Sequence, residues 1–233
     1  MCSKQYSGSR GVINLSDVFT GVYRPADVAR YIRADLSDAI TAKTTSKRLT
    51  RWIRNGYFDP DLAGKSGRDM TLSFEDLISM RVIATLRSAG VTFPKIRVAE
   101  GWLRQQTRYP RPFAVEQIWT ESSDVFAEMH ERLIAASRYG QLAMEMLREE
   151  LIPVHGLTFN SRRIASLWSP REGILLDPEI QFGQSCISGT GIPTNAIASM
   201  NRAGDSIETI ADMYAISGTE VESAISWEFS LAA

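Results

Sequence analysis

The first half of this chain is organised around one short stretch, Thr44-Thr45-Ser46-Lys47-Arg48-Leu49-Thr50-Arg51-Trp52-Ile53-Arg54-Asn55-Gly56-Tyr57. Leu49, Trp52 and Ile53 follow the i, i+3, i+4 spacing that places three apolar side chains on one stripe of a helix. The stretch therefore predicts a short helix whose apolar stripe packs on a core. A threonine at its start can cap the first turn, and Gly56 can end the last turn.

The other face of this predicted helix is basic and rich in hydroxyl groups. Such side chains suit phosphate oxygens and the edges of bases. A solvated surface helix is the alternative that a run of charge leaves open. We expect the DNA-contacting residues of this helix to be Thr45, Ser46, Lys47, Arg48, Thr50, Arg51 and Arg54.

The two halves of the chain have opposite charge. The net charge of the 233 residues is −1, but residues 1–112 carry 19 Lys and Arg against 10 Asp and Glu, whereas residues 113–233 carry 7 against 17. A polyanion attracts a basic surface and repels an acidic one. Nucleic acid, if it is bound, should therefore be bound by the first half.

The elements around the basic helix have a recognisable order. A first helix should start near Pro25, and the connection from Arg33 to Lys43 is longer than in a usual helix-turn-helix. A glycine-flanked tip with Lys65 and Arg68 then predicts a wing whose basic side chains hold the DNA backbone. Ser73 should cap a long helix over 74–90, and Pro94 should open a further helix.

This order resembles the MerR-type winged helix-turn-helix over residues 14–108. The resemblance implies operator binding as a homodimer, because dimers contact two half-sites. The residues that carry it are Tyr23 to Ala29, Arg51-Trp52, Gly56-Tyr57, Leu72 to Leu77, Ala89 to Val91 and Ile96-Arg97.

The middle of the chain, residues 109–175, predicts a small α+β region with a central β sheet. Apolar and polar positions from Phe113 to Met129 favour a hairpin, and residues 142–151 favour a helix. Short strand candidates follow at Thr158-Phe159, Ile164 to Trp168 and Gly173 to Leu176. With helices on both sides of this region, the expected fold class is α+β, mainly α.

Residues 176–233 predict a loop followed by three helices in a homeodomain-like arrangement. The helices should cover 195–202, 206–214 and 219–229. The loop, with Gly183, Gly189-Thr190 and Ile192-Pro193, resembles a domain of unknown function (DUF433-type) that recurs in VapB-type antitoxins encoded beside PIN-domain toxins. Many members have Pro where Ser185 stands and Arg where Gly191 stands. The last helix carries three glutamates and no basic residue, so we expect it to bind protein or to dimerise rather than to contact DNA.

The resemblance implies an antitoxin that neutralises a PIN-domain ribonuclease toxin and represses its own operon by binding operator DNA. A stand-alone MerR-like transcriptional regulator and an interaction adaptor that does not bind DNA are the alternatives. A salt-dependent affinity for DNA would separate the adaptor from the other two.

We expect no enzymatic activity, no cofactor and no metal site. Ser188 to Gly191 lacks the Gly-Lys-Ser/Thr ending of a phosphate loop, and His130 and His155 have no metal-ligand spacing. Two distant cysteines, Cys2 and Cys186, indicate a reducing compartment. No apolar run resembles a secretion signal, so the expected location is the cytoplasm.

Overall fold

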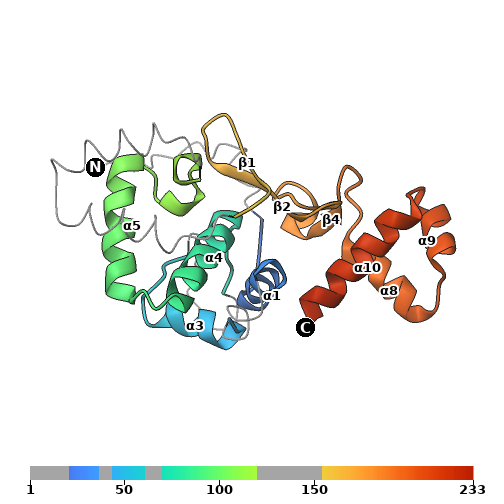
Figure 1. The fold of residues 1–233 in the computed structure, drawn as a ribbon, viewed down its shortest axis with the longest axis horizontal. Coiled ribbons are helices and arrows are strands. Elements are labelled where there is room, and N and C mark those ends of the chain that lie inside the picture. Colours follow the sequence, from blue (N-terminus) through green and yellow to red (C-terminus); the bar gives the residue numbers. More distant parts are fainter. Residues whose placement is uncertain (1–20, 37–43, 61–69, 120–153, 233) are drawn as a thin grey trace, which may run out of the picture.

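A computed structural model describes residues 21–36, 44–60, 70–119 and 154–232 (Figure 1). Over these residues the chain is α+β and mainly α, as predicted, with one small antiparallel sheet. The predicted wing with Lys65 and Arg68, the second half of the predicted hairpin and the predicted helix over 142–151 lie outside the described residues.

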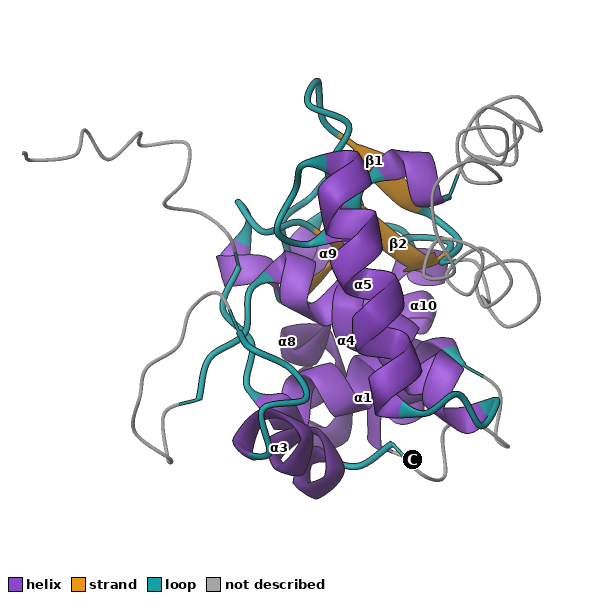
Figure 2. Cartoon of the chain, turned by 90° about the vertical axis from the view of Figure 1, so that its left-hand side faces the viewer, coloured by secondary structure: helices purple, strands orange, loops and turns teal. Residues whose placement is uncertain are grey.

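In the part of the chain that the structure describes before the sheet, four α-helices are present. They are α1 (Pro25–Asp35), α3 (Ser46–Arg54), α4 (Phe74–Ser88) and α5 (Phe93–Thr107). Helix α4 is buried on all sides from Phe74 to Leu86 apart from one half-buried position, because its neighbours surround it. Figure 2 shows α4 and α5 side by side, with α3 at one end of the group and the sheet at the other.

The start of α4 is held by reciprocal capping, as Ser73 predicted. Ser73 Oγ accepts a hydrogen bond from the Asp76 backbone N–H at 3.1 Å, and the Asp76 carboxylate accepts one from the Ser73 N–H at 3.0 Å. Just before the cap, Leu72 exchanges two backbone hydrogen bonds with Tyr23. These contacts join the start of α1 to the start of α4.

Two buried ion pairs also involve α4. Arg81 Nε donates to Asp35 at 2.9 Å, which joins α4 to the end of α1, and the Arg111 guanidinium lies 2.9 Å from the Asp76 carboxylate. Burial lowers the pKa of Arg81, and the Asp35 carboxylate opposes that shift. A buried charge needs such a partner to offset the loss of water.

The predicted hairpin is wrong in its first half, the part that the structure describes. Residues Pro112–Ala114 (η2) and Glu116–Ile118 (η3) are two 3₁₀ turns. Pro112 lacks a backbone N–H and cannot take part fully in a strand ladder. Phe113, Ala114 and Ile118 are all buried together in the core, so the sequence does not alternate between an inner and an outer face.

The sheet contains β1 (Leu157–Phe159), β2 (Ala165–Arg171), β3 (Ile174–Leu176) and β4 (Ser185–Ile187) in the order β1-β2-β3-β4, all antiparallel. The three predicted strands are confirmed. Strand β4 was not predicted, because its three residues lie inside a glycine-rich stretch that carries no alternating pattern.

Three helices end the chain, as predicted, at α8 (Thr194–Ala203), α9 (Ile207–Tyr214) and α10 (Gly218–Ala232). They enclose a small core of Ile187, Ile197, Ile210, Val221 and Ala224. The second half of α10 leaves this core and packs on α1, where the ring of Trp227 stacks on Tyr31 at 6.2 Å between centroids. The large core of the first part therefore includes the end of the last helix.

Candidate nucleic-acid interface and the C-terminal helices

Helix α3 has the two faces that its spacing predicted. Thr45 is the N-cap, and its Oγ1 accepts a hydrogen bond from the Arg48 backbone N–H at 3.3 Å. Leu49 and Trp52 are buried, and Gly56 ends the helix with φ +66°. A residue with a Cβ adopts that φ with strain, so glycine suits this turn.

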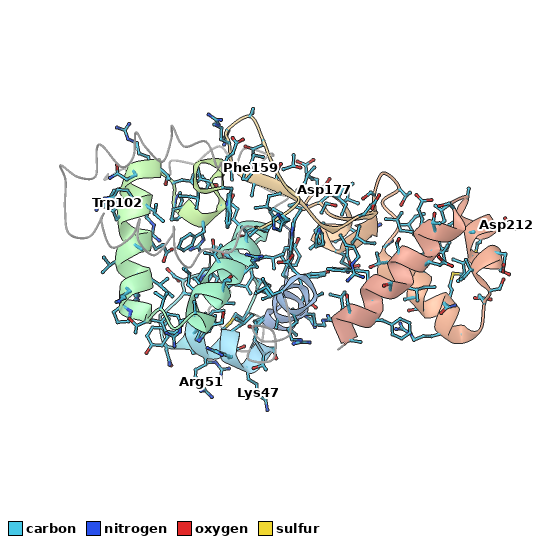
Figure 3. All side chains as sticks on the ribbon, viewed as in Figure 1. Lys47, Arg51, Trp102, Phe159, Asp177 and Asp212 are labelled. Atoms are coloured by element: carbon cyan, nitrogen blue, oxygen red, sulfur yellow. The ribbon has the colours of Figure 1, made fainter. Side chains whose placement is uncertain are left out.

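The predicted contact residues of α3 differ in exposure. Lys47, Arg51 and Arg54 are exposed, and Figure 3 shows Lys47 and Arg51 pointing away from the body of the molecule. Ser46, Arg48 and Thr50 are half-buried. Thr45 is exposed, but its hydroxyl oxygen already accepts the capping bond. The exposed cations thus form the outer edge of the helix.

Arg48 is held against the helix more closely than Lys47 or Arg51. Its guanidinium lies over the Trp52 ring, 5.2 Å from the centroid. Burial, together with the nearby charge of Arg87, lowers the pKa of Arg48. Cation–π contact of this kind fixes the side chain, so Arg48 has less freedom to reach a ligand.

The basic surface continues onto the start of α5, which sequence reasoning missed. The Tyr57 and Phe93 rings stack at 4.2 Å with an interplanar angle of 7°, and Trp52 meets Phe93 edge-on at 5.3 Å. Arg97 donates to the carbonyl of Gly56, and Lys95 is exposed nearby in sequence. The charges of Lys95 and Arg97 are visible in the sequence, but their place beside α3 is not.

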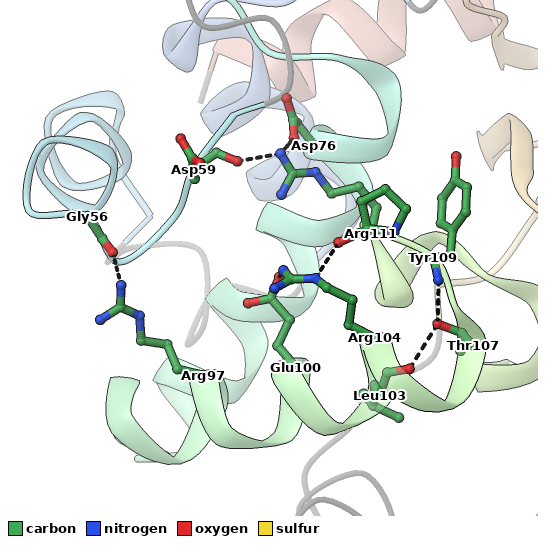
Figure 4. Close-up of polar contacts among 11 residues, drawn as sticks. Gly56, Asp59, Asp76, Arg97, Glu100, Leu103, Arg104, Thr107, Tyr109 and Arg111 are labelled. Atoms are coloured by element: carbon green, nitrogen blue, oxygen red, sulfur yellow. Dashed lines mark hydrogen bonds and ion pairs between the residues drawn. The ribbon is translucent and has the colours of Figure 1, made fainter.

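A cavity of about 480 Å³ lies between the end of α3 and α5 (Figure 4). Most of the cationic groups along it already bond to protein acceptors. Arg104 contacts Glu100 and the Pro110 carbonyl, and Arg111 contacts the Asp59 carbonyl. Burial raises the pKa of Glu100, although the neighbouring arginines oppose that shift. Arg97 and Arg111, through the carbonyls of Gly56 and Asp59, therefore hold the segment that follows α3 in place.

The glycine-rich run after β4 forms a structural turn. Thr190 Oγ1 donates to the Ile187 carbonyl at 2.9 Å and accepts from the Ile192 N–H at 3.0 Å. Burial raises the pKa of the nearby Cys186 thiol to about 11, which disfavours the reactive thiolate. The turn thus directs the chain from β4 into α8.

Helix α10 presents its apolar positions to the interior. Val221, Ala224 and Trp227 are buried, as expected for core residues, whereas Phe229 is exposed. Glu220 accepts a 2.7 Å hydrogen bond from the Ser217 N–H at the start of the helix, which lowers the Glu220 pKa. None of the helices in the described part of the chain is long and apolar enough to cross a membrane.

Comparisons with known proteins bear on the C-terminal part and on the fold. A Mycobacterium tuberculosis (strain ATCC 25618 / H37Rv) protein named "Putative antitoxin VapB45" is 23% identical over 176 residues, which cover 69% of this chain and 72% of that protein. The crystal structure of Rv2018 from Mycobacterium tuberculosis has a similar fold, with a TM-score of 0.63 and 20% identity over 87% of this chain and 96% of that one. Residues 174–227 match the model of a protein family of unknown function, DUF433, which confirms the resemblance seen in the C-terminal loop and helices.

Proposed function

We propose that this protein is the antitoxin of a toxin–antitoxin pair, which neutralises a PIN-domain ribonuclease toxin and represses its own operon. The observation that carries the proposal is the separation of two unlike surfaces on one fold. Lys47 and Arg51 of α3 lie on the lower edge of the first part of the molecule, and Asp212 lies on the acidic helices at the far right (Figure 3). The similarity to a protein named as an antitoxin supports the same conclusion.

The DNA-binding half of the proposal rests on the exposed edge of α3. Lys47, Arg51 and Arg54 can neutralise phosphates, and the Ser46 and Thr50 hydroxyls can reach phosphates or base edges. Lys65 and Arg68 would hold the backbone from the wing of the proposed domain over 14–108. A homodimer would place two copies of α3 on two half-sites, because one half-site offers too few contacts for tight binding.

The toxin-binding half rests on the charge of the C-terminal module. Residues 174–232 contain eight Asp and Glu but a single basic residue, Arg202. Like charges across an interface are costly, so this module should avoid nucleic acid and bind a basic protein surface. A groove that handles RNA is such a surface. In the proposed division, residues 176–233 bind the toxin and residues 109–175 link the two activities.

A gel-shift titration on the chain's own upstream DNA tests the first half. We expect wild type to bind with an affinity that falls as salt rises, and Lys47→Ala/Arg51→Ala to bind far more weakly. Arg162→Ala/Arg202→Ala is the matched control, since it removes two charges that are also exposed but lie outside α3. Equal weakening in both double variants would mean that only total charge matters and would contradict a role for α3.

Co-purification tests the second half. The tagged chain should retain the PIN-domain protein encoded beside it, and the purified pair should lack the ribonuclease activity of that protein alone. Failure to retain it, with both proteins soluble and folded, would remove the antitoxin assignment and leave a DNA-binding regulator.

A further inference from the structure

A second cavity, of about 140 Å³, lies where the first helix meets the C-terminal module. Helix α1 and the residues just before it form one wall, and β4, α8 and the end of α10 form the other. Figure 1 shows the end of α10 beside α1, and the two helices are in contact. The lining residues that decide its chemistry are Tyr23, Asp27, Arg30, Tyr31, Gln184 and Glu228.

The charged side chains of this cavity have a net charge of −1, because two carboxylates face one guanidinium. Asp27 and Arg30 form an ion pair within α1. The Glu228 carboxylate accepts a hydrogen bond from Thr194 Oγ1 at 2.5 Å, which leaves its charge in place. Among the residues that the structure describes, no cation lies within ion-pair distance of Glu228. The uncompensated charge of the cavity is therefore that of Glu228.

The two carboxylates act on the same hydroxyl from opposite walls. Burial raises the pKa of Tyr31, and hydrogen bonds with Ser185 oppose that shift. The charges of Asp27 on α1 and Glu228 on α10 raise the Tyr31 pKa further. A cation in the cavity would interact favourably with both carboxylates, whereas an anion would be repelled by them.

The wall of the cavity also contains a hydroxyl group without a partner. Tyr23 is only 2% exposed, and its Oη has no hydrogen-bond partner among the described residues. Gly183, the neighbour of Gln184, keeps the space beside this oxygen open, because a Cβ there would overlap it. A buried hydroxyl that makes no hydrogen bond is costly, and phenylalanine would avoid that cost. The Tyr23 hydroxyl therefore indicates a bound group that completes its hydrogen bonding.

The other lining groups suit an organic cation. Tyr23 and Tyr31 meet edge-on at 6.1 Å between ring centroids, and aromatic rings attract a cation. The side-chain oxygen of Gln184 can accept an N–H bond. A metal ion fits less well, because no group of three His, Cys, Asp or Glu side chains is placed to bind one in the described part of the chain. At about 30 Å³ for a water-sized group, the cavity holds about four or five non-hydrogen atoms.

We propose that this cavity binds a small primary ammonium compound, whose charged nitrogen bonds to the Glu228 carboxylate and to the Tyr23 hydroxyl oxygen. We call it the junction site. The inference is independent of DNA binding and of toxin binding. Because its contacts come from α1 and α10 together, the junction site exists only while these two helices are packed. A bound ammonium compound therefore stabilises their packing.

The test uses 2-aminoethanol hydrochloride as the probe and the full-length protein at neutral pH and fixed ionic strength. Calorimetry should give saturable binding with a dissociation constant of about 1–10 mM, the range open to four non-hydrogen atoms. At ten to a hundred times that concentration the melting temperature should rise by about 3–10 °C. The neutral compound 1,2-ethanediol has the same size and should produce neither effect.

Three variants assign the binding to the junction site. Glu228→Gln keeps an acceptor for Thr194 but removes the charge, so affinity for 2-aminoethanol should fall at least about tenfold. Glu222→Gln is the matched control on the same helix, because Glu222 is exposed and outside the cavity, and it should change the affinity less than about twofold. Tyr23→Phe should weaken binding about three- to tenfold, while the melting temperature of the free protein stays the same or rises.

Each of three results would overturn the inference. If wild type shows no saturable binding of 2-aminoethanol, the cavity holds water only. If 1,2-ethanediol binds as tightly as 2-aminoethanol, charge does not select the bound compound. If Glu228→Gln binds 2-aminoethanol as tightly as Glu222→Gln does, the binding takes place elsewhere on the protein.

Discussion

The close contact between Gly183 and Tyr23 can be tested by substitution at Gly183. An added Cβ at this position would lie 2.1 Å from Tyr23 Oη and 2.7 Å from Tyr23 Cζ, well inside van der Waals contact. Tyr23 is only 2% exposed, and its ring meets Tyr31 edge-on at 6.1 Å, so it has little room to move. Burial also raises the Tyr23 pKa well above its ordinary value.

Gly183→Ala should therefore lose stability for two separate reasons. The backbone φ of +88° costs an alanine about 1–2 kcal/mol. Forcing the methyl group against the buried tyrosine costs about 1–3 kcal/mol more, as in other overpacked cores. Gly189→Ala is the control, because Gly189 has φ +77° and no atom within 4 Å of its added Cβ. That variant should lose only the backbone contribution.

Urea denaturation followed by tryptophan fluorescence measures both variants. The fully buried Trp168 and Trp227 report on the sheet and on the junction with α1. We expect Gly183→Ala to be about 1–3 kcal/mol less stable than Gly189→Ala. Equal losses in the two variants would show that Tyr23 moves aside freely, and the reasoning from steric overlap would be wrong.

Three further predictions concern individual residues. In salt titrations of operator binding, Arg51→Ala should reduce the magnitude of the slope of log affinity against log salt by about 0.9, whereas Arg202→Ala should leave it unchanged. Thr45→Ala removes the cap of α3 and should lower the free energy of unfolding by about 1 kcal/mol, while Thr45→Ser should retain it, as thermal melts would show. In a Cys2→Ser variant, Cys186 is the remaining thiol, and it should react with iodoacetamide at pH 8 roughly a hundredfold more slowly than an ordinary thiol. The reason is that a pKa of about 11 leaves far less thiolate at that pH. Reaction at the ordinary rate would contradict the burial of Cys186.

Local pattern was sufficient to predict most of the helices. Leu49 and Trp52 are buried as their spacing required, Thr45 and Ser73 act as caps, and the three C-terminal helices lie within a few residues of their predicted bounds. These features depend on neighbours within one or two turns, and the sequence contains that information. The predicted DNA contacts of α3 remain a prediction, although their exposure on one edge is compatible with it.

Prediction from the sequence pattern failed where the conformation of a segment depends on contacts with residues far away in the sequence. Phe113 and Ile118 were assigned to a strand, but they enter the core from 3₁₀ turns beside Pro112. Strand β4 forms because Cys186 pairs with Leu175 of β3 in an antiparallel register. The three residues of β4 do not alternate between apolar and polar side chains, so the sequence pattern does not predict a strand there.

The sequence by itself determined most of the α-helices, their bounds to within a few residues, and how charge divides between the two halves. The tertiary structure decided which helices meet. It brought Phe93 of α5 against Tyr57 beyond α3, stacked Trp227 on Tyr31, and left the ring of Phe182 exposed on a strained loop. The physical reason is the distance along the sequence between the residues that interact. Caps and helical stripes are settled by hydrogen bonds and spacing within a few residues, whereas packing between distant segments depends on the shapes of all the surfaces that are buried together.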